Sequence, residues 1–197
     1  MPKPMRMRQD PACAVAREEQ IYSEEVVLNS DTTLANVFVY IKEGLAQQHY
    51  AAPVEPKILN QQHCRYTPHV FGIQVGQTLK ILNSDPTFHN VHAAAKNNKP
   101  FNLGMSKVEK VKTRTFDQAE VMIPLHCNVH PWMSAYVGVV DHPFYSVTDS
   151  TGRYQFQALS AGAYVVAAWH EVFGSMTQEI KLADNETKIL EFIFTRR

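Results

Sequence analysis

Two apolar, strand-like runs enclose a short loop between Val121 and Val140, in the stretch VMIPLHCNVHPWMSAYVGVV. The loop carries Cys127, His130 and Met133 in the spacing C-x2-H-x2-M. A thiolate, an imidazole and a thioether on one turn form a soft ligand set, and such sets select copper over magnesium or calcium. The stretch therefore predicts a copper site on a loop between two β-strands.

A mononuclear blue-copper centre also needs a second histidine from elsewhere in the chain. Upstream, the segment NSDPTFHNV reads as a strand end, a turn, and His89 at the start of the next apolar run. The hypothesis is one copper ion bound by His89, Cys127 and His130, with Met133 as a weaker axial ligand. Met105, which follows the segment FNLG, is the reserve axial ligand.

These two segments resemble the cupredoxins, the small copper proteins of the plastocyanin and pseudoazurin type. In that family the first ligand lies in a His-Asn-Val segment, like residues 89–91, and the others lie in a C-x2-H-x4-M loop. Here the methionine comes two residues sooner. The resemblance implies that the Asn90 backbone N–H donates to the Cys127 sulfur and that the Asn90 side chain braces the loop. A single cysteine in the loop argues against a binuclear copper centre.

Other histidines are expected to lie outside the copper site. His92 is three residues beyond His89, so strand alternation sends it to the opposite face. His126 precedes Cys127 and likewise points away. We expect both to be structural or exposed, and we leave the role of His170 open.

The middle of the chain reads as successive short strands with little helical periodicity. The expected strands are Val70–Val75, Thr78–Asn83, His89–Ala94, Val108–Phe116, Val121–Leu125 and Ala135–Val140. This spacing is typical of an all-β sandwich or Greek-key barrel. The cupredoxin resemblance implies the same architecture.

A second β-module is expected from the two ends of the chain. The segment VTDSTGRYQFQALSAGAYVVAAWH resembles carboxypeptidase-regulatory-like domains, which are transthyretin-like β-sandwiches, and further strands are expected at 176–182 and 187–194. The run LANVFV resembles the early strand of that fold. A helical turn is expected at 44–50. The prolines in Ala51–Pro56 exclude a central strand and mark a boundary between the modules. We therefore expect a cupredoxin domain at 57–142, inserted into a split β-sandwich formed by 1–56 and 143–197.

Composition excludes several classes of partner. The 197 residues carry 19 basic and 19 acidic side chains, so no basic excess points to nucleic acid. No apolar run approaches the roughly 20 residues of a membrane span. Cys13 and Cys64 remain as an even pair once Cys127 is assigned, and they are either a disulfide or two small unpaired hydrophobic residues. A disulfide favours an exported, periplasmic protein. We see no signal peptide in this sequence and expect that one would have been removed.

The expected function is electron carriage by one type 1 copper ion, with a cytochrome or a respiratory complex as the kind of redox partner. The chain would then not be an enzyme. Two alternatives stay open: a copper enzyme with an open coordination position, and a copper chaperone or structural module. In the leading interpretation Pro131 and Trp132 form an apolar docking patch beside an exposed edge of His130.

Overall fold

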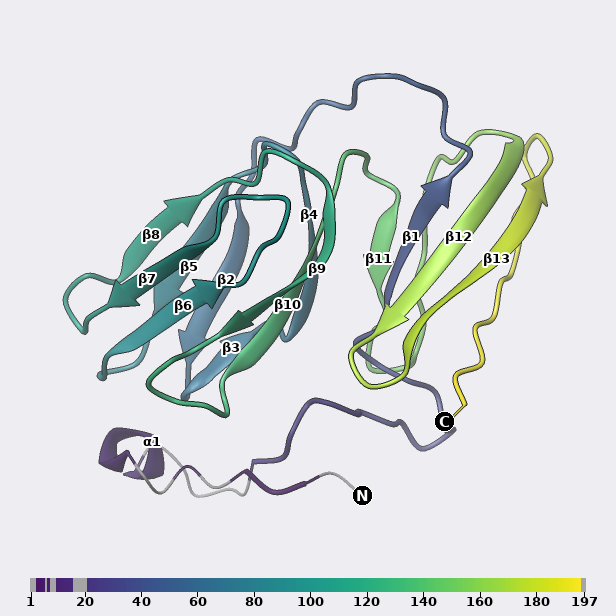
Figure 1. Cartoon of the computed structure of the whole chain (residues 1–197). Helices are drawn as coiled ribbons and strands as arrows, with labels where there is room; N and C mark the ends of the chain where they lie inside the picture. Colours follow the sequence, from purple (N-terminus) through teal and green to yellow (C-terminus); the bar gives the residue numbers. More distant parts are fainter. Residues whose placement is uncertain (1–2, 6, 8–9, 16–20, 196–197) are drawn as a thin grey trace. The chain divides into compact units, whose positions relative to one another are not determined.

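The computed structural model describes residues 3–5, 7, 10–15 and 21–195 (Figure 1). Within these residues the chain is nearly all β, with thirteen strands and one five-residue helix, α1 (Pro11–Val15). None of the described helical structure is long and apolar enough to cross a bilayer. The chain divides into two compact units, the first made of Met1–Glu24 and Ala51–Asp141 and the second of Glu25–Tyr50 and His142–Arg197. The prediction of an all-β protein is confirmed.

The first unit contains two β-sheets, which Figure 1 shows as layers facing each other. The five-stranded sheet has the order β4-β10-β9-β6-β7, and the four-stranded sheet has the order β3-β2-β5-β8. Each sheet contains one parallel pair, β4 with β10 and β2 with β5, among antiparallel neighbours. The strand bounds are β2 (Lys57–Gln62), β3 (Arg65–Thr67), β4 (Val70–Gln74), β5 (Leu79–Asn83), β6 (His89–Ala93), β7 (Phe101–Met105), β8 (Val111–Arg114), β9 (Glu120–His126) and β10 (Ser134–Val140).

Apolar side chains from both sheets form one core. Strand β5 alternates between buried and half-buried positions because one of its faces packs on this core. Leu59 and Ile81 from one sheet join Val91 and Val137 from the other in the same buried cluster. Burying each such side chain stabilises the fold by about 1.5–3 kcal/mol. Cys127 belongs to this cluster too, so the predicted site is built on the core.

The six strands expected in the middle of the chain all coincide with observed strands, but three others were not foreseen. Strands β2, β3 and β7 have the sequences KILNQQ, RYT and FNLGM, which contain polar residues or glycine and no long apolar run. Pairing with neighbouring strands, rather than local hydrophobicity, therefore decides these elements. The expected helical turn at 44–50 is wrong. Gly44 adopts φ 101°, outside the right-handed helical region, directly after β1 (Phe38–Glu43).

The amino-terminal segment is tied to the first unit by a disulfide. Asp10 caps α1, since its Oδ1 accepts the Ala12 N–H at 2.8 Å. Cys13 of α1 is bonded to Cys64, in the turn between β2 and β3, and this confirms the expected pair. With a sequence separation of 51 residues, the bond would stabilise the fold by about 4 kcal/mol in the chain-entropy model.

The compact units differ from the expected domain boundaries. The sequence predicts that residues 1–56 belong to the split outer sandwich, whereas the stretches up to Glu24 and from Ala51 group with the first unit. Residues 1–2, 6, 8–9, 16–20 and 196–197 of that expected domain lie outside the described residues. The division of the chain into two domains stays a prediction.

The second unit contains one four-stranded sheet in the order β11-β1-β12-β13. Its further strands are β11 (Tyr145–Val147), β12 (Gly162–His170) and β13 (Gly174–Leu182). The strand expected at 187–194 is wrong, because this segment has no strand pairing. Its side chains Leu190, Phe192 and Phe194 still pack on the core of the sheet, together with Tyr154 and Phe156. The alternating apolar side chains of this segment therefore reflect packing on the core, although its backbone is not paired with a strand.

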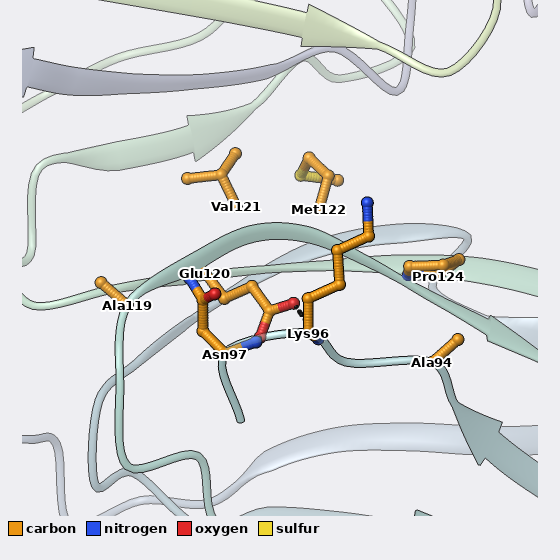
Figure 2. A pocket seen from close by; sticks show the side chains of 8 residues that line it. All are labelled: Ala94, Lys96, Asn97, Ala119, Glu120, Val121, Met122 and Pro124. Carbon is orange, nitrogen blue, oxygen red and sulfur yellow. Dashed lines mark hydrogen bonds between the residues drawn. The ribbon is translucent and has the colours of Figure 1, made fainter. Parts of the chain in front are cut away.

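A shallow pocket lies at the start of β9, the end of the strand remote from Cys127 (Figure 2). The Glu120 carboxylate accepts the backbone N–H groups of Lys96 at 2.6 Å, Asn97 at 3.0 Å and Asn98 at 2.9 Å. These hydrogen bonds satisfy loop donors that would otherwise need water. Glu120 therefore orders the loop beside this pocket.

Candidate metal centre

Three of the predicted ligands, His89, Cys127 and His130, come together in the first unit. His89 is the first residue of β6, Cys127 directly follows β9, and His130 lies in the turn before β10. Their exposed fractions are 0%, 2% and 2%, so all three are shielded from water. The Met133 N–H donates to the His130 carbonyl at 2.9 Å, and the Cys127 N–H donates to the Met133 carbonyl at 3.1 Å. The loop is therefore held in place by its own backbone.

The three ligand atoms are close enough to share one ion. The Nδ1 atoms of His89 and His130 are 2.8 Å apart, and Cys127 Sγ lies 3.9 Å from His130 Nδ1. All three atoms lie within 4.8 Å of one another. Ligand atoms about 2.0–2.3 Å from a metal in a trigonal arrangement are separated by roughly 3.5 Å. Small side-chain movements are enough to admit a metal ion.

The Cys127 sulfur lies in surroundings that favour the thiolate. Burial raises the pKa of this thiol, but hydrogen bonds from His89 and from the backbone N–H groups of Asn90, His130 and Val129 outweigh it and lower the pKa to about 6. The contact from Asn90 is the one that the family resemblance implies. Since the thiolate is the form that binds metals, the sulfur is ready for a soft ion at neutral pH.

Each imidazole is held from outside by a carboxylate. His89 Nε2 lies 2.9 Å from Asp85 Oδ2, and His130 Nε2 lies 2.8 Å from Asp10 Oδ2. A carboxylate that accepts an N–H from one ring nitrogen fixes the tautomer and leaves the other nitrogen free for a metal. Both Nδ1 atoms consequently face Cys127.

The two carboxylates are themselves held in the charged form. Desolvation raises the pKa of Asp85, yet hydrogen bonds from His89 and from the backbone N–H groups of Cys64 and His63 lower it by more. Those backbone donors lie at 2.7 Å and 2.6 Å. The hydrogen bond with His130 is the largest influence on the pKa of Asp10 and lowers it. Both rings therefore face anionic acceptors.

The short contact between the rings shows what a metal ion would replace. With both Nε2–H groups donating outward, two Nδ1 lone pairs face each other unless one ring carries an extra proton. Burial lowers the pKa of His89, but Asp85 and Cys127 together raise it above its ordinary value. A metal ion bound to both Nδ1 atoms would take the place of this contact between the rings.

Asn90 braces the ligand loop, as the resemblance implies. Its Oδ1 accepts the Asn128 backbone N–H at 2.8 Å, and its Nδ2 donates to the Asn128 side chain at 2.9 Å. The Asn90 carbonyl accepts a short hydrogen bond from the Tyr66 hydroxyl. Strand β6 is thereby joined to the loop that follows β9, and His89 is held opposite Cys127.

Both candidate axial methionines are buried, Met133 with 1% exposed and Met105 with none. Met105 is the cross-strand partner of His89, and its Sδ lies 3.0 Å from Gln61 Nε2. The Met105 sulfur therefore already accepts a hydrogen bond from the Gln61 amide. Met133 packs in the same core cluster as Cys127.

The expected exposed edge of His130 is wrong. The residue is 2% exposed, and its Nε2 is occupied by the Asp10 carboxylate. Trp132 is half-buried, lies 5.1 Å from the His130 ring, and donates its Nε1–H to the Cys64 carbonyl at 3.1 Å. The tryptophan is thus anchored to the disulfide turn by its indole N–H.

Sequence reasoning missed both carboxylates. In the sequence Asp85 appears only as part of a predicted turn, and no local motif marks Asp10 as a partner of a histidine. The expected disulfide was the one usable signal, because a bond from Cys13 to Cys64 brings the amino-terminal segment to the turn beside Asp85.

Comparison with known proteins gives similarity to solved structures only. No protein-family model matches the chain, and no curated protein does. A copper-containing nitrite reductase (NirK) from Thermus scotoductus SA-01 is 19% identical, with a TM-score of 0.40 over 49% of this chain and 25% of that one. This chain therefore spans a quarter of the reductase. A methionine-to-alanine variant of amicyanin in the Cu(I) state is 23% identical, with a TM-score of 0.39 over 51% of this chain and 97% of that one.

The first prediction concerns the Cys127 thiol in the metal-free protein. Its thiolate absorbance, taken as the difference from Cys127→Ser, should titrate with a midpoint near pH 6, against 9.0 for an ordinary thiol. Between these values the unfolded chain binds one more proton than the folded one, so the free energy of unfolding should rise with pH. This contribution is complete above pH 9 and lost as pH falls through 6. A midpoint near 9 would contradict the described hydrogen bonding.

The second prediction concerns Asp10. In Asp10→Asn the amide oxygen can still cap α1, but the NH2 group then faces His130 Nε2 and favours the tautomer protonated at Nδ1. We expect the affinity for copper(II) to fall about 10–100-fold, measured by competition with a chelator. The exposed Asp141→Asn is the matched control and should bind like the wild type. Equal affinity in Asp10→Asn would show that this carboxylate does not set the tautomer.

Proposed function

We propose that this chain is a mononuclear type 1 copper protein that carries single electrons between redox partners. The observation that carries the proposal is the buried group of His89, Cys127 and His130, whose ligand atoms lie within 4.8 Å of one another. Two imidazoles and a thiolate are acceptable to both oxidation states of copper. Copper bound there would supply one-electron redox chemistry.

The surroundings of the group support a cupredoxin-like domain. The ligands come from a strand start and from a loop between two neighbouring strands, and the backbone of Asn90 donates to the sulfur. The protein's own task is to keep both imidazoles and the sulfur in one arrangement while the charge of the ion changes. The hydrogen bonds of Asp10, Asp85 and Asn90 serve that task by limiting ring and loop movement.

Met133 is the proposed axial ligand. It follows His130 in the same closed turn, whereas Met105 already accepts a hydrogen bond from Gln61. A weak axial thioether tunes the reduction potential of a blue-copper site. The short C-x2-H-x2-M spacing would make this loop tighter than the one found in plastocyanin-type proteins.

An exported, periplasmic location is part of the proposal. The bond between Cys13 and Cys64 supports it, since disulfides persist in oxidising compartments. The partners would be redox proteins such as a cytochrome or a respiratory complex. With a formal net charge of zero, long-range steering toward them would be weak unless charges are segregated on the surface.

The third prediction tests the centre itself. The oxidised protein with one equivalent of copper should be intensely coloured, because a thiolate bound to copper(II) gives strong charge transfer. Cys127→Ser should lose the colour and keep the fold, as judged by circular dichroism. A colourless wild type that holds stoichiometric copper(II) would overturn the proposal.

The same preparation separates the carrier from its alternatives. Reversible one-electron cycling with fast self-exchange supports an electron carrier. Binding of azide or nitric oxide at the copper would favour an enzyme with an open position. Rapid transfer of the copper to a competing apoprotein would favour a chaperone.

The fourth prediction assigns the axial ligand. Met133→Leu should keep copper and colour but raise the reduction potential, since loss of a thioether donor destabilises copper(II). Met105→Leu, a matched change of a buried methionine, should shift the potential far less. Voltammetry of both variants decides between them, and a shift confined to Met105→Leu would transfer the role to that residue.

A further inference from the structure

Two histidines stand side by side on the outer face of the five-stranded sheet. His92 of β6 and His126 of β9 are direct cross-strand partners. Their ring centroids are 4.4 Å apart, with 44° between the ring planes, and both side chains are half-buried. The candidate centre lies on the other face of these strands, because Val91, Leu125 and Cys127 point into the core.

The pair has an unused ligand atom. Within the described part of the chain, His92 Nδ1 is buried and has no hydrogen-bond partner. A buried polar atom without a partner costs free energy, so such an atom in a folded protein needs an explanation. A metal ion supplies one, since a neutral imidazole nitrogen is the commonest protein ligand for transition metals.

The spacing of the rings suits a shared ion. Two imidazoles bound to one metal at about 2.0–2.1 Å, at roughly a right angle or slightly more, have their centroids roughly 4.5–5 Å apart. The observed 4.4 Å is close to this distance. Both histidines lie on rigid paired strands, so the backbone already holds them in register.

Polar side chains continue the same row across the sheet. The cross-strand partner of His92 on β7 is Asn102, and that of His126 on β10 is Ser134. Water or the Ser134 hydroxyl could complete the coordination, whereas the Asn102 side-chain oxygen already accepts a hydrogen bond from Asn90 Nδ2 at 2.7 Å. Cys127, the one free thiol among the described residues, belongs to the core side. This face therefore offers nitrogen and oxygen donors without a thiolate, whereas the candidate centre combines two imidazoles with a thiolate.

We propose that His92 and His126 form a second metal site, which binds a divalent ion with nitrogen and oxygen ligands and prefers copper(II). Among first-row divalent ions, copper(II) binds such donors most tightly, ahead of nickel(II) and zinc(II). The site is distinct from the thiolate centre, although His126 directly precedes Cys127 in the chain. The inference does not rest on the proposed electron-carrier function, because neither histidine belongs to the Cys127 cluster.

The test is a titration of the full chain with copper(II) chloride, followed by electron paramagnetic resonance and by absorbance. We expect one equivalent that produces thiolate colour and a second that gives a tetragonal signal with nitrogen ligands and no thiolate band. His92→Asn and His126→Asn should each weaken the second equivalent about tenfold or more, and the double variant should lose it. The coloured equivalent should persist in His92→Asn, which reports that this variant is folded.

His49→Asn is the matched control, because His49 is an exposed histidine of the second unit. This change should leave the second equivalent intact. The proposal is overturned if no colourless equivalent binds, or if His92→Asn and the double variant bind it as tightly as the wild type. Failure of the coloured equivalent alone would instead count against the electron-carrier proposal, so the two results are distinguishable.

Discussion

Two hydrogen bonds between carboxylates and imidazoles determine the geometry of the candidate metal centre. Asp85 and Asp10 each hold the Nε2 atom of one histidine, so the Nδ1 atoms of His89 and His130 are turned toward Cys127. Without these acceptors either ring could rotate or change tautomer, and the ligand set would not converge. The rest of the first unit can be understood as the frame that brings these five side chains together.

That frame is cross-linked on the side of the carboxylates. The disulfide joins α1, which Asp10 caps, to the turn whose Cys64 N–H donates to Asp85. The disulfide therefore positions both carboxylates, Asp10 and Asp85, relative to the two sheets of the first unit. Because the turn also accepts the Trp132 indole N–H, the ligand loop is fixed from the same side. A rigid surrounding of this kind would serve the proposed electron transfer, because ligands that move little lower the reorganisation that the transfer requires.

The same arrangement changes how a partner could reach the centre. In the expected arrangement an exposed histidine edge would have met the partner, but here His130 is 2% exposed and its Nε2 faces Asp10. Apolar side chains beside the candidate ligands that remain accessible include Val129 and Phe88, with 49% and 48% of their surface exposed, and Pro131 is exposed too. A redox partner would meet these groups or the covering segment before it met the imidazole.

The sequence by itself determined the all-β class. It also predicted the grouping of His89, Cys127 and His130 and singled out Cys13 and Cys64 as a pair, without deciding whether that pair is bonded. Short apolar runs reveal strands that face a core, and Cys127 and His130 stand on one short loop whose spacing is visible in the chain. Tertiary structure alone decided strands β2, β3 and β7, whose polar sequences become strands only through pairing with neighbours.

Tertiary structure also decided the role of Asp10, which lies 120 residues from His130, and the pairing of His92 with His126. Local sequence patterns report which face of a strand is buried. They carry no information about which distant side chain completes a hydrogen bond, because that depends on the register between strands and on where a cross-link holds the chain end.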